Sequence, residues 1–100
     1  MSQKSGAARS SSPNGFTEKQ GEYLAFIYAY SRMFRRAPAE TDMQRHFQVT
    51  PPSVHQMVLT LERNGLIRRQ QGVARSIEIL VPPEDLPILK WLQINRSKPL

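Results

Sequence analysis

The feature that most constrains this chain is the stretch 50–65, which carries the marks of one helix with both ends defined. The Thr50 hydroxyl can cap the first turn, and the prolines that follow lose no hydrogen bond at the start of a helix. Gly65 provides the left-handed residue at which helices commonly stop. Between these ends, apolar residues recur with helical spacing and form a single stripe, namely Val54, Met57, Val58 and Leu61. The stretch therefore predicts an amphipathic helix over residues 50 to 64.

The opposite side of this helix has an informative composition. It carries no acidic residue, since Glu62 falls beside the apolar stripe. Small hydroxyls, an amide and an imidazole near a helix N-terminus can form hydrogen bonds with base edges in a DNA major groove. The residues on this side are Pro52, Ser53, His55, Gln56, Leu59, Thr60 and Arg63. An ordinary surface helix has a similar pattern, so the segments on either side must decide between the two interpretations.

Length and composition narrow the class of protein. One hundred residues with 39% hydrophobic content fit one small domain. The absence of cysteine excludes disulfides and thiolate metal sites. No apolar run approaches the roughly 20 residues of a membrane-spanning helix, and the N-terminus lacks the apolar region of a signal peptide. We therefore expect no membrane contact and a cytoplasmic protein, which would be associated with the nucleoid in a bacterium.

The net charge of +6 is unevenly distributed. Eight arginines and three acids lie between Arg32 and Arg75, which gives this part of the chain a local charge of +5. Arginine suits phosphate and guanine because its planar guanidinium donates two hydrogen bonds at once. A solubility role is the alternative explanation, but the charge favours a nucleic acid as the partner.

Residues 1–15 are rich in serine and small residues and predict a disordered basic tail, with a minor-groove arm as the alternative.

Two helices are expected before residue 50. Thr17 with Gln20 forms a capping box that opens a helix over about 17–33. Its apolar residues are Tyr23, Leu24, Phe26, Ile27, Tyr30 and Phe34. After a break at Ala37-Pro38, a short helix over 40–47 turns Met43 and Phe47 inward.

The pattern changes from helical to alternating after Gly65. Residues 66–70 and 75–80 predict two strands, and 71–74 predict the connecting turn with Gly72 as its permissive residue. A hairpin directly after the reading helix is a wing. Its arginines, Arg68, Arg69 and Arg75, are expected along a phosphate backbone or in a minor groove.

The segment after the hairpin predicts one more element. Within residues 82–95, Glu84 and Asp85 are expected to begin a last helix, which covers about 86–94. Its apolar residues lie around the whole circumference, so one face remains without a partner within the domain. We interpret this segment as a candidate homodimerisation element, with packing on its own domain as the rival interpretation. Residues 96–100 predict a frayed tail.

The order helix, helix, helix, strand, strand resembles the winged helix-turn-helix class. Within this class the chain, from Phe16 to Leu80, is similar to the N-terminal DNA-binding domain of the LexA repressor. The motifs that carry the similarity are Phe16-Thr17 with Gln20, Ala37-Pro38, Thr50-Pro51, Asn64-Gly65-Leu66-Ile67 and the wing from Gly72 to Leu80. Thr50-Pro51-Pro52-Ser53-Val54 and Leu61 to Ile67 also resemble MarR-type regulators. The implied fold is mainly α with a small β wing, which is a three-helix core plus a hairpin over residues 16–81 and an extra C-terminal helix.

The resemblance implies that the major groove is met by Thr50, Pro52, Ser53, His55 and Gln56. The LexA family has an asparagine and two glutamates where this chain has Pro52, His55 and Gln56, so the DNA sequence that it recognises should differ. That family also continues into a self-cleaving domain, which we do not expect in this chain.

The leading hypothesis is a sequence-specific transcriptional regulator that binds double-stranded DNA as a homodimer. Ser53, His55, Gln56 and Thr60 would read bases, while Thr50, Arg63, Arg69 and Arg75 would hold phosphates. The alternative is a winged-helix protein-interaction module, which the apolar Leu59 on the reading face would favour. RNA binding through the aromatic residues is a weaker option, because those residues have the spacing of a core.

Enzymatic chemistry is not indicated by the sequence. His46 and His55 are the only histidines, and without cysteine they make a weak case for zinc. The serines cluster in the tail, the acids are scattered, and no glycine-rich phosphate loop occurs. We therefore expect no catalytic site, no cofactor and no small-molecule ligand.

Overall fold

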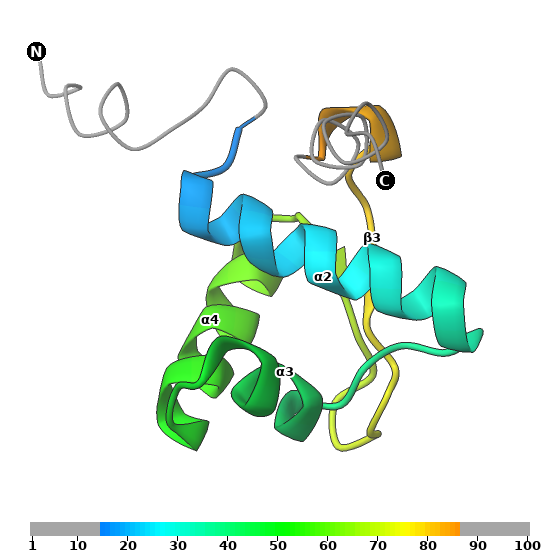
Figure 1. Cartoon of the computed structure of the whole chain (residues 1–100). Helices are drawn as coiled ribbons and strands as arrows, with labels where there is room; N and C mark the ends of the chain where they lie inside the picture. Colours follow the sequence, from blue (N-terminus) through cyan, green and yellow to red (C-terminus); the bar gives the residue numbers. More distant parts are fainter. Residues whose placement is uncertain (1–14, 87–100) are drawn as a thin grey trace, which may run out of the picture.

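The computed structural model describes residues 15–86. Three helices form the body of this part of the chain, and a two-stranded antiparallel hairpin lies beside them (Figure 1). In chain order the elements are α2 (Glu18–Phe34), α3 (Glu40–Phe47), α4 (Pro51–Arg63), β2 (Ile67–Arg68), β3 (Glu78–Ile79) and the 3₁₀ turn η1 (Pro83–Asp85). This mainly helical architecture confirms the predicted winged helix-turn-helix fold.

The start of α2 is set by the capping box that the sequence predicts. The Thr17 hydroxyl accepts the Gln20 N–H at 3.1 Å, and the Gln20 amide oxygen accepts the Thr17 N–H at 2.9 Å. The helix ends at Phe34, after which Arg35 adopts a left-handed conformation with φ of 63°. Phe34 is 53% exposed rather than part of the core, because the last turn of α2 extends past the other helices.

The helix-turn-helix is formed by α3 and α4. At the start of α3 the Asp42 carboxylate accepts the Ala39 N–H at 2.8 Å. Gln48 takes a left-handed conformation in the turn, with φ of 57°. Thr50 then caps α4 by accepting the Ser53 N–H at 3.4 Å. Gly65 follows the end of α4 with φ of 76°, so the predicted stop is confirmed.

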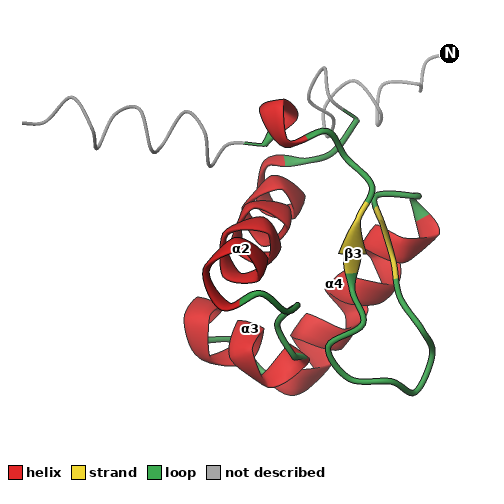
Figure 2. Cartoon of the chain, turned by 90° about the vertical axis from the view of Figure 1, so that its right-hand side faces the viewer, coloured by secondary structure: helices red, strands yellow, loops and turns green. Residues whose placement is uncertain are grey.

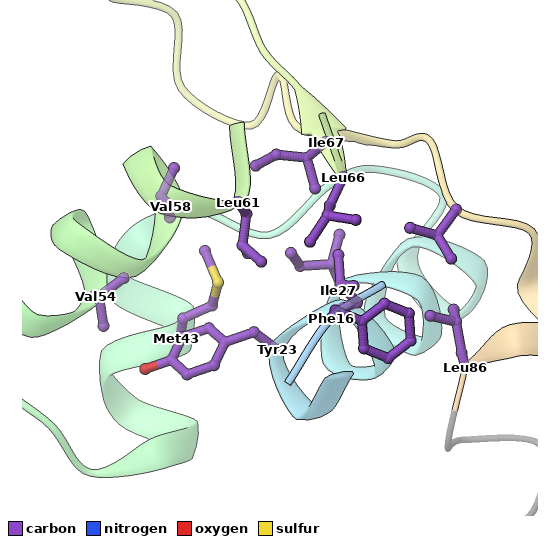
Figure 3. Close-up of a cluster of buried hydrophobic side chains, with 12 residues drawn as sticks. Phe16, Tyr23, Ile27, Met43, Val54, Val58, Leu61, Leu66, Ile67 and Leu86 are labelled. Atoms are coloured by element: carbon purple, nitrogen blue, oxygen red, sulfur yellow. The ribbon is translucent and has the colours of Figure 1, made fainter. Parts of the chain in front are cut away.

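The core is formed by the apolar faces of these helices (Figure 3). Val54, Val58 and Leu61 of the α4 stripe have no exposed surface. They meet side chains from the other two helices and from the start of the hairpin, namely Tyr23, Leu24, Ile27, Met43, Leu66 and Ile67. Burial of this stripe leaves the opposite side of α4 facing outward.

The wing is a shorter hairpin than the sequence predicts. Only Ile67 and Arg68 pair with Ile79 and Glu78, whereas strands over 66–70 and 75–80 were expected. Beyond these pairs the Ser76 hydroxyl joins the two sides of the loop, because it accepts the Gln70 N–H at 2.9 Å and donates toward the carbonyl oxygens of Gln70 and Val73, at 3.2 and 2.8 Å. The result is a long loop over residues 69–77 (Figure 2).

The described chain ends against the core. Glu84 and Asp85 form a single 3₁₀ turn rather than the first turn of the expected α-helix, and Leu86 after it is extended. Leu86 is buried and lies beside Phe16 (Figure 3). The rest of the expected helix and both predicted tails lie outside the described residues. Among the described helices, none combines the length and the apolar character needed to cross a membrane.

Candidate nucleic-acid interface

The outward side of α4 carries the residues that the sequence assigns to base reading. Pro52, Ser53, His55 and Gln56 are exposed, while Thr60 is half-buried. Their position follows from the apolar stripe, which fixes the rotation of α4 about its own axis. The structure therefore brings the predicted reading residues together on one face.

The first turn of α4 holds a pair of hydroxyls. The Thr50 hydroxyl donates to the Ser53 oxygen at 3.0 Å and also accepts the Ser53 N–H. The Ser53 hydroxyl proton remains able to donate to a ligand, because the Ser53 oxygen acts as the acceptor in this pair. Thr50 thus caps the helix and orients Ser53 at the same time.

Gln56 is the clearest base-reading candidate. Within the part of the chain that the structure describes, its amide makes no hydrogen bond to another residue. It lines an open groove together with Ser53 and Thr60 of α4 and with Thr17 and Gln20 at the start of α2. A glutamine side chain presents one donor and one acceptor side by side, which matches the two adjacent groups on an adenine edge.

His55 has a neighbour that the sequence did not predict. Its Nδ1 atom lies 3.2 and 3.3 Å from the two carboxylate oxygens of Glu40, the first residue of α3. The outward side of α4 is therefore free of acids on its own helix, but α3 contributes one carboxylate beside it. Because 15 residues separate the two side chains along the chain, no local pattern reveals the contact.

Arg69 and Arg75, which the sequence predicts to hold phosphates, have partners within the domain. Arg69 donates to the Glu62 carboxylate at 3.0 Å, and its side chain is only 15% exposed. Arg75 donates to the Tyr30 hydroxyl at 3.1 Å and to the Ala37 carbonyl oxygen at 3.2 Å, and it pairs with Asp42 at 3.1 Å. Both guanidinium groups therefore face carboxylates of their own domain.

The electrostatics of the Arg75 network fit this internal role. The Ala39 N–H and, less strongly, Arg75 hold the pKa of Asp42 below its usual range. The hydrogen bond to Tyr30 and the nearby carboxylate of Asp42 raise the pKa of Arg75. This cluster joins the wing to α2 and α3, so Arg75 positions the wing.

Arg68 and Arg63 differ in the partners of their guanidinium groups. Arg68 on the wing pairs with Glu78 on the opposite strand at 2.8 Å, so all three wing arginines have carboxylate partners. Arg63 at the end of α4 is exposed and donates only to the Thr60 hydroxyl, at 3.3 Å. Arg63 is therefore the predicted phosphate-binding arginine that the structure leaves most available.

Comparison with known proteins gives a consistent classification. A family model described as the iron dependent repressor N-terminal DNA binding domain matches residues 15–72. A LexA repressor of Thermosipho africanus is 36% identical over 72 residues, which cover 72% of this chain and 36% of that protein. A LexA repressor of Verrucomicrobium spinosum is 39% identical over 62 residues, or 61% of this chain and 31% of that protein.

A solved structure gives the same fold. A point mutant of MepR from a multidrug-resistant S. aureus clinical isolate superposes with a TM-score of 0.52 at 22% identity, covering 92% of this chain and 63% of that one. At this identity the likeness concerns the fold alone. The chain spans about a third of the length of the LexA repressors that it matches.

Proposed function

The chain belongs to the family of iron dependent repressor N-terminal DNA-binding domains, and from this premise we propose that it is a sequence-specific transcriptional regulator of double-stranded DNA. It is a winged-helix DNA-binding domain of the repressor type. The proposal of sequence-specific binding rests on the exposed side of α4, where the side chains of Ser53, His55 and Gln56 are all exposed near the helix N-terminus.

In the proposed complex α4 enters the major groove. Ser53, His55, Gln56 and Thr60 read base edges, and Pro52 packs against the groove. A helix of this diameter fits the major groove, and hydroxyl, amide and imidazole groups supply both donors and acceptors to the bases. Thr50 and Arg63, at the two ends of the helix, contact phosphates and fix its register.

The wing has a different proposed role from the one that its arginines suggest. Its guanidinium groups are paired, so the wing contributes mainly through the position of its exposed loop tip, which runs from Gln71 to Ala74. Figure 1 draws this loop at the same lower edge of the molecule as α3 and the start of α4. That placement supports contact of the wing loop and of α4 with one side of a duplex.

Homodimerisation on a pseudo-palindromic site remains part of the proposal. Its support is the apolar composition of residues 86–94, which lie largely beyond the described part of the chain. We therefore also propose a cytoplasmic location, on the nucleoid in a bacterium.

The family name raises the question of iron. Among residues 15–86, no three His, Cys, Asp or Glu side chains gather closely enough to hold one ion. The donor set of this domain therefore does not fit an iron site, and we assign no role to a metal in the proposed binding.

Salt dependence tests the proposed function. The affinity of the full chain for a pool of duplex DNA should fall steeply as salt rises, because each phosphate contact releases a counterion. Arg63→Ala should reduce the slope of log affinity against log salt by about 1. Arg36→Ala removes the same charge from the exposed linker between α2 and α3 and should leave the slope nearly unchanged.

The same measurement separates the two functional hypotheses. Absence of duplex binding at low salt would contradict the proposal and favour the protein-interaction module. Leu59, which motivated that alternative, is half-buried in the described structure, so the exposed side of α4 is more polar than its sequence suggested.

A further inference from the structure

We propose that Glu40 is a positioning residue for DNA recognition, because it fixes the tautomer of His55 and makes base preference at one position of the site depend on pH. This inference rests on the proposed function. It deepens that function by assigning a role to a residue outside the reading helix.

The geometry places the two side chains in a fixed relation. Glu40 opens α3, where a carboxylate is stabilised by the positive end of the helix dipole. His55 lies in the second turn of α4, with Nδ1 at 3.2 Å from the nearer carboxylate oxygen. Contacts between α3 and α4 hold these two helices together, so the carboxylate approaches only one of the two ring nitrogens.

The charged side chains around Glu40 and His55 pair with other residues. Glu40 and His55 line a shallow pocket against the wing, whose other charged lining residues are Arg69 and Arg75. Those guanidinium groups pair with Glu62 on α4 and Asp42 on α3. Among the described residues, His55 is therefore the one basic side chain in contact with Glu40.

The consequence for His55 follows from the chemistry of imidazole. In the neutral ring one nitrogen carries the proton and the other accepts, and the choice is set by the hydrogen bond that one of them makes. A carboxylate at Nδ1 requires a proton on Nδ1, which leaves Nε2 as an acceptor directed away from Glu40. When the ring takes up a second proton from solvent, Nε2 becomes a donor while Nδ1 keeps its bond to Glu40.

The two states would favour different bases. An Nε2 acceptor pairs with the amino group of adenine or cytosine in the major groove, whereas an Nε2 donor pairs with O6 or N7 of guanine. Raising the pH should therefore shift preference at one base pair from guanine toward adenine or cytosine. Without Glu40 the neutral ring is free to place its proton on either nitrogen, so the difference between the two pH values should shrink.

The first arm of the test uses the free protein. Nitrogen-15 NMR of the full chain with the His55 ring neutral should show the proton on Nδ1. Glu40→Gln should give a mixture of tautomers, because an amide can either accept from Nδ1 or donate to it. Glu22→Gln removes the same charge from the exposed side of α2 and should leave the His55 spectrum unchanged.

The second arm uses duplexes selected by the protein and then varied at single base pairs. At one pair, the ratio of affinities for guanine and adenine should change roughly fivefold between about pH 5.5 and 8, the worth of one net hydrogen bond. Glu40→Gln should reduce this change, His55→Asn should abolish it, and Glu22→Gln should preserve it.

The possible outcomes test the role of Glu40 separately from the proposed binding to DNA. Selective duplex binding with the same pH response in the native protein and Glu40→Gln would overturn the role of Glu40 and leave the proposed function intact. A His55 ring that carries its proton on Nε2 in the free native protein would also overturn it. Failure to bind any duplex would instead contradict the proposed function.

Discussion

Arg75 shows how the position of a single side chain can reverse an expectation drawn from charge. Its backbone has φ of 57°, which is unusual for a residue other than glycine, and its guanidinium reaches back to α2 and α3. A conformation of this kind persists where surrounding contacts determine it. The residue therefore acts inside the domain even though it belongs to the exposed wing.

Removal of the Arg75 side chain should lower stability. For Arg75→Ala we expect a lower free energy of unfolding, since Asp42 and Tyr30 lose a hydrogen-bonding partner. Denaturant unfolding of the native protein and the variant measures this change in free energy. Arg68→Ala, which breaks an exposed pair, should change the free energy of unfolding less than Arg75→Ala does. Unchanged stability together with weaker DNA binding for Arg75→Ala would restore the phosphate role.

Asp42 should give the domain a specific response to acid. Its pKa lies below the usual value of 3.8, chiefly because it accepts the Ala39 N–H. Such a carboxylate stabilises the fold above its unfolded pKa and loses that contribution as pH falls through its folded pKa. Free energies of unfolding should therefore decline below about pH 4 in the native protein and decline less in Asp42→Asn. Parallel pH profiles for the two proteins would contradict this assignment.

The site residues whose contacts sequence reasoning did not predict share one property. Arg69, Arg75 and His55 all have partners far along the chain or on another element, and the Arg75–Tyr30 contact spans 45 residues. Ser53 and Gln56 are placed as predicted because their exposure depends only on the rotation of α4. A count of arginines gives the charge of a segment but not which of those charges are already paired.

At the scale of elements, the helices could be predicted closely because their ends are defined by nearby residues. The Thr17 and Thr50 caps and the stop at Gly65 each involve side chains within a few positions of the helix end. The strands could not be predicted as well. Their length depends on pairing across the hairpin, where the hydroxyl of Ser76 takes the backbone groups that a longer ladder would use.

The turn between α3 and α4 offers a test at this scale. Gln48 is left-handed, a conformation that side chains other than glycine adopt at a cost of about 1 kcal/mol. Gln48→Gly should therefore stabilise the domain by up to about 1 kcal/mol, measured by thermal unfolding. The same substitution at Gln44, inside α3, should destabilise it by about 1 kcal/mol. Destabilisation by both would show that the turn is not strained.

At the scale of the whole molecule, the distribution of charge and shape indicates which surface would face DNA. The net charge of +6 does not by itself define that surface, because the arginines of the wing are matched by carboxylates. The start of α4 and the wing loop both lie at the lower edge of the molecule in Figure 1. Specificity should therefore reside mainly in α4, while the wing adds position and little charge.

Selection of binding sites from random duplex DNA tests this claim most directly, with the native protein and Gln56→Ala compared side by side. We predict that the native protein recovers a defined sequence and that Gln56→Ala loses preference at one base-pair position of that sequence while it keeps the others. Arg63→Ala, as the control, should weaken binding without changing the recovered sequence. Recovery of one and the same sequence by the native protein and Gln56→Ala, or of no sequence by the native protein, would contradict the account.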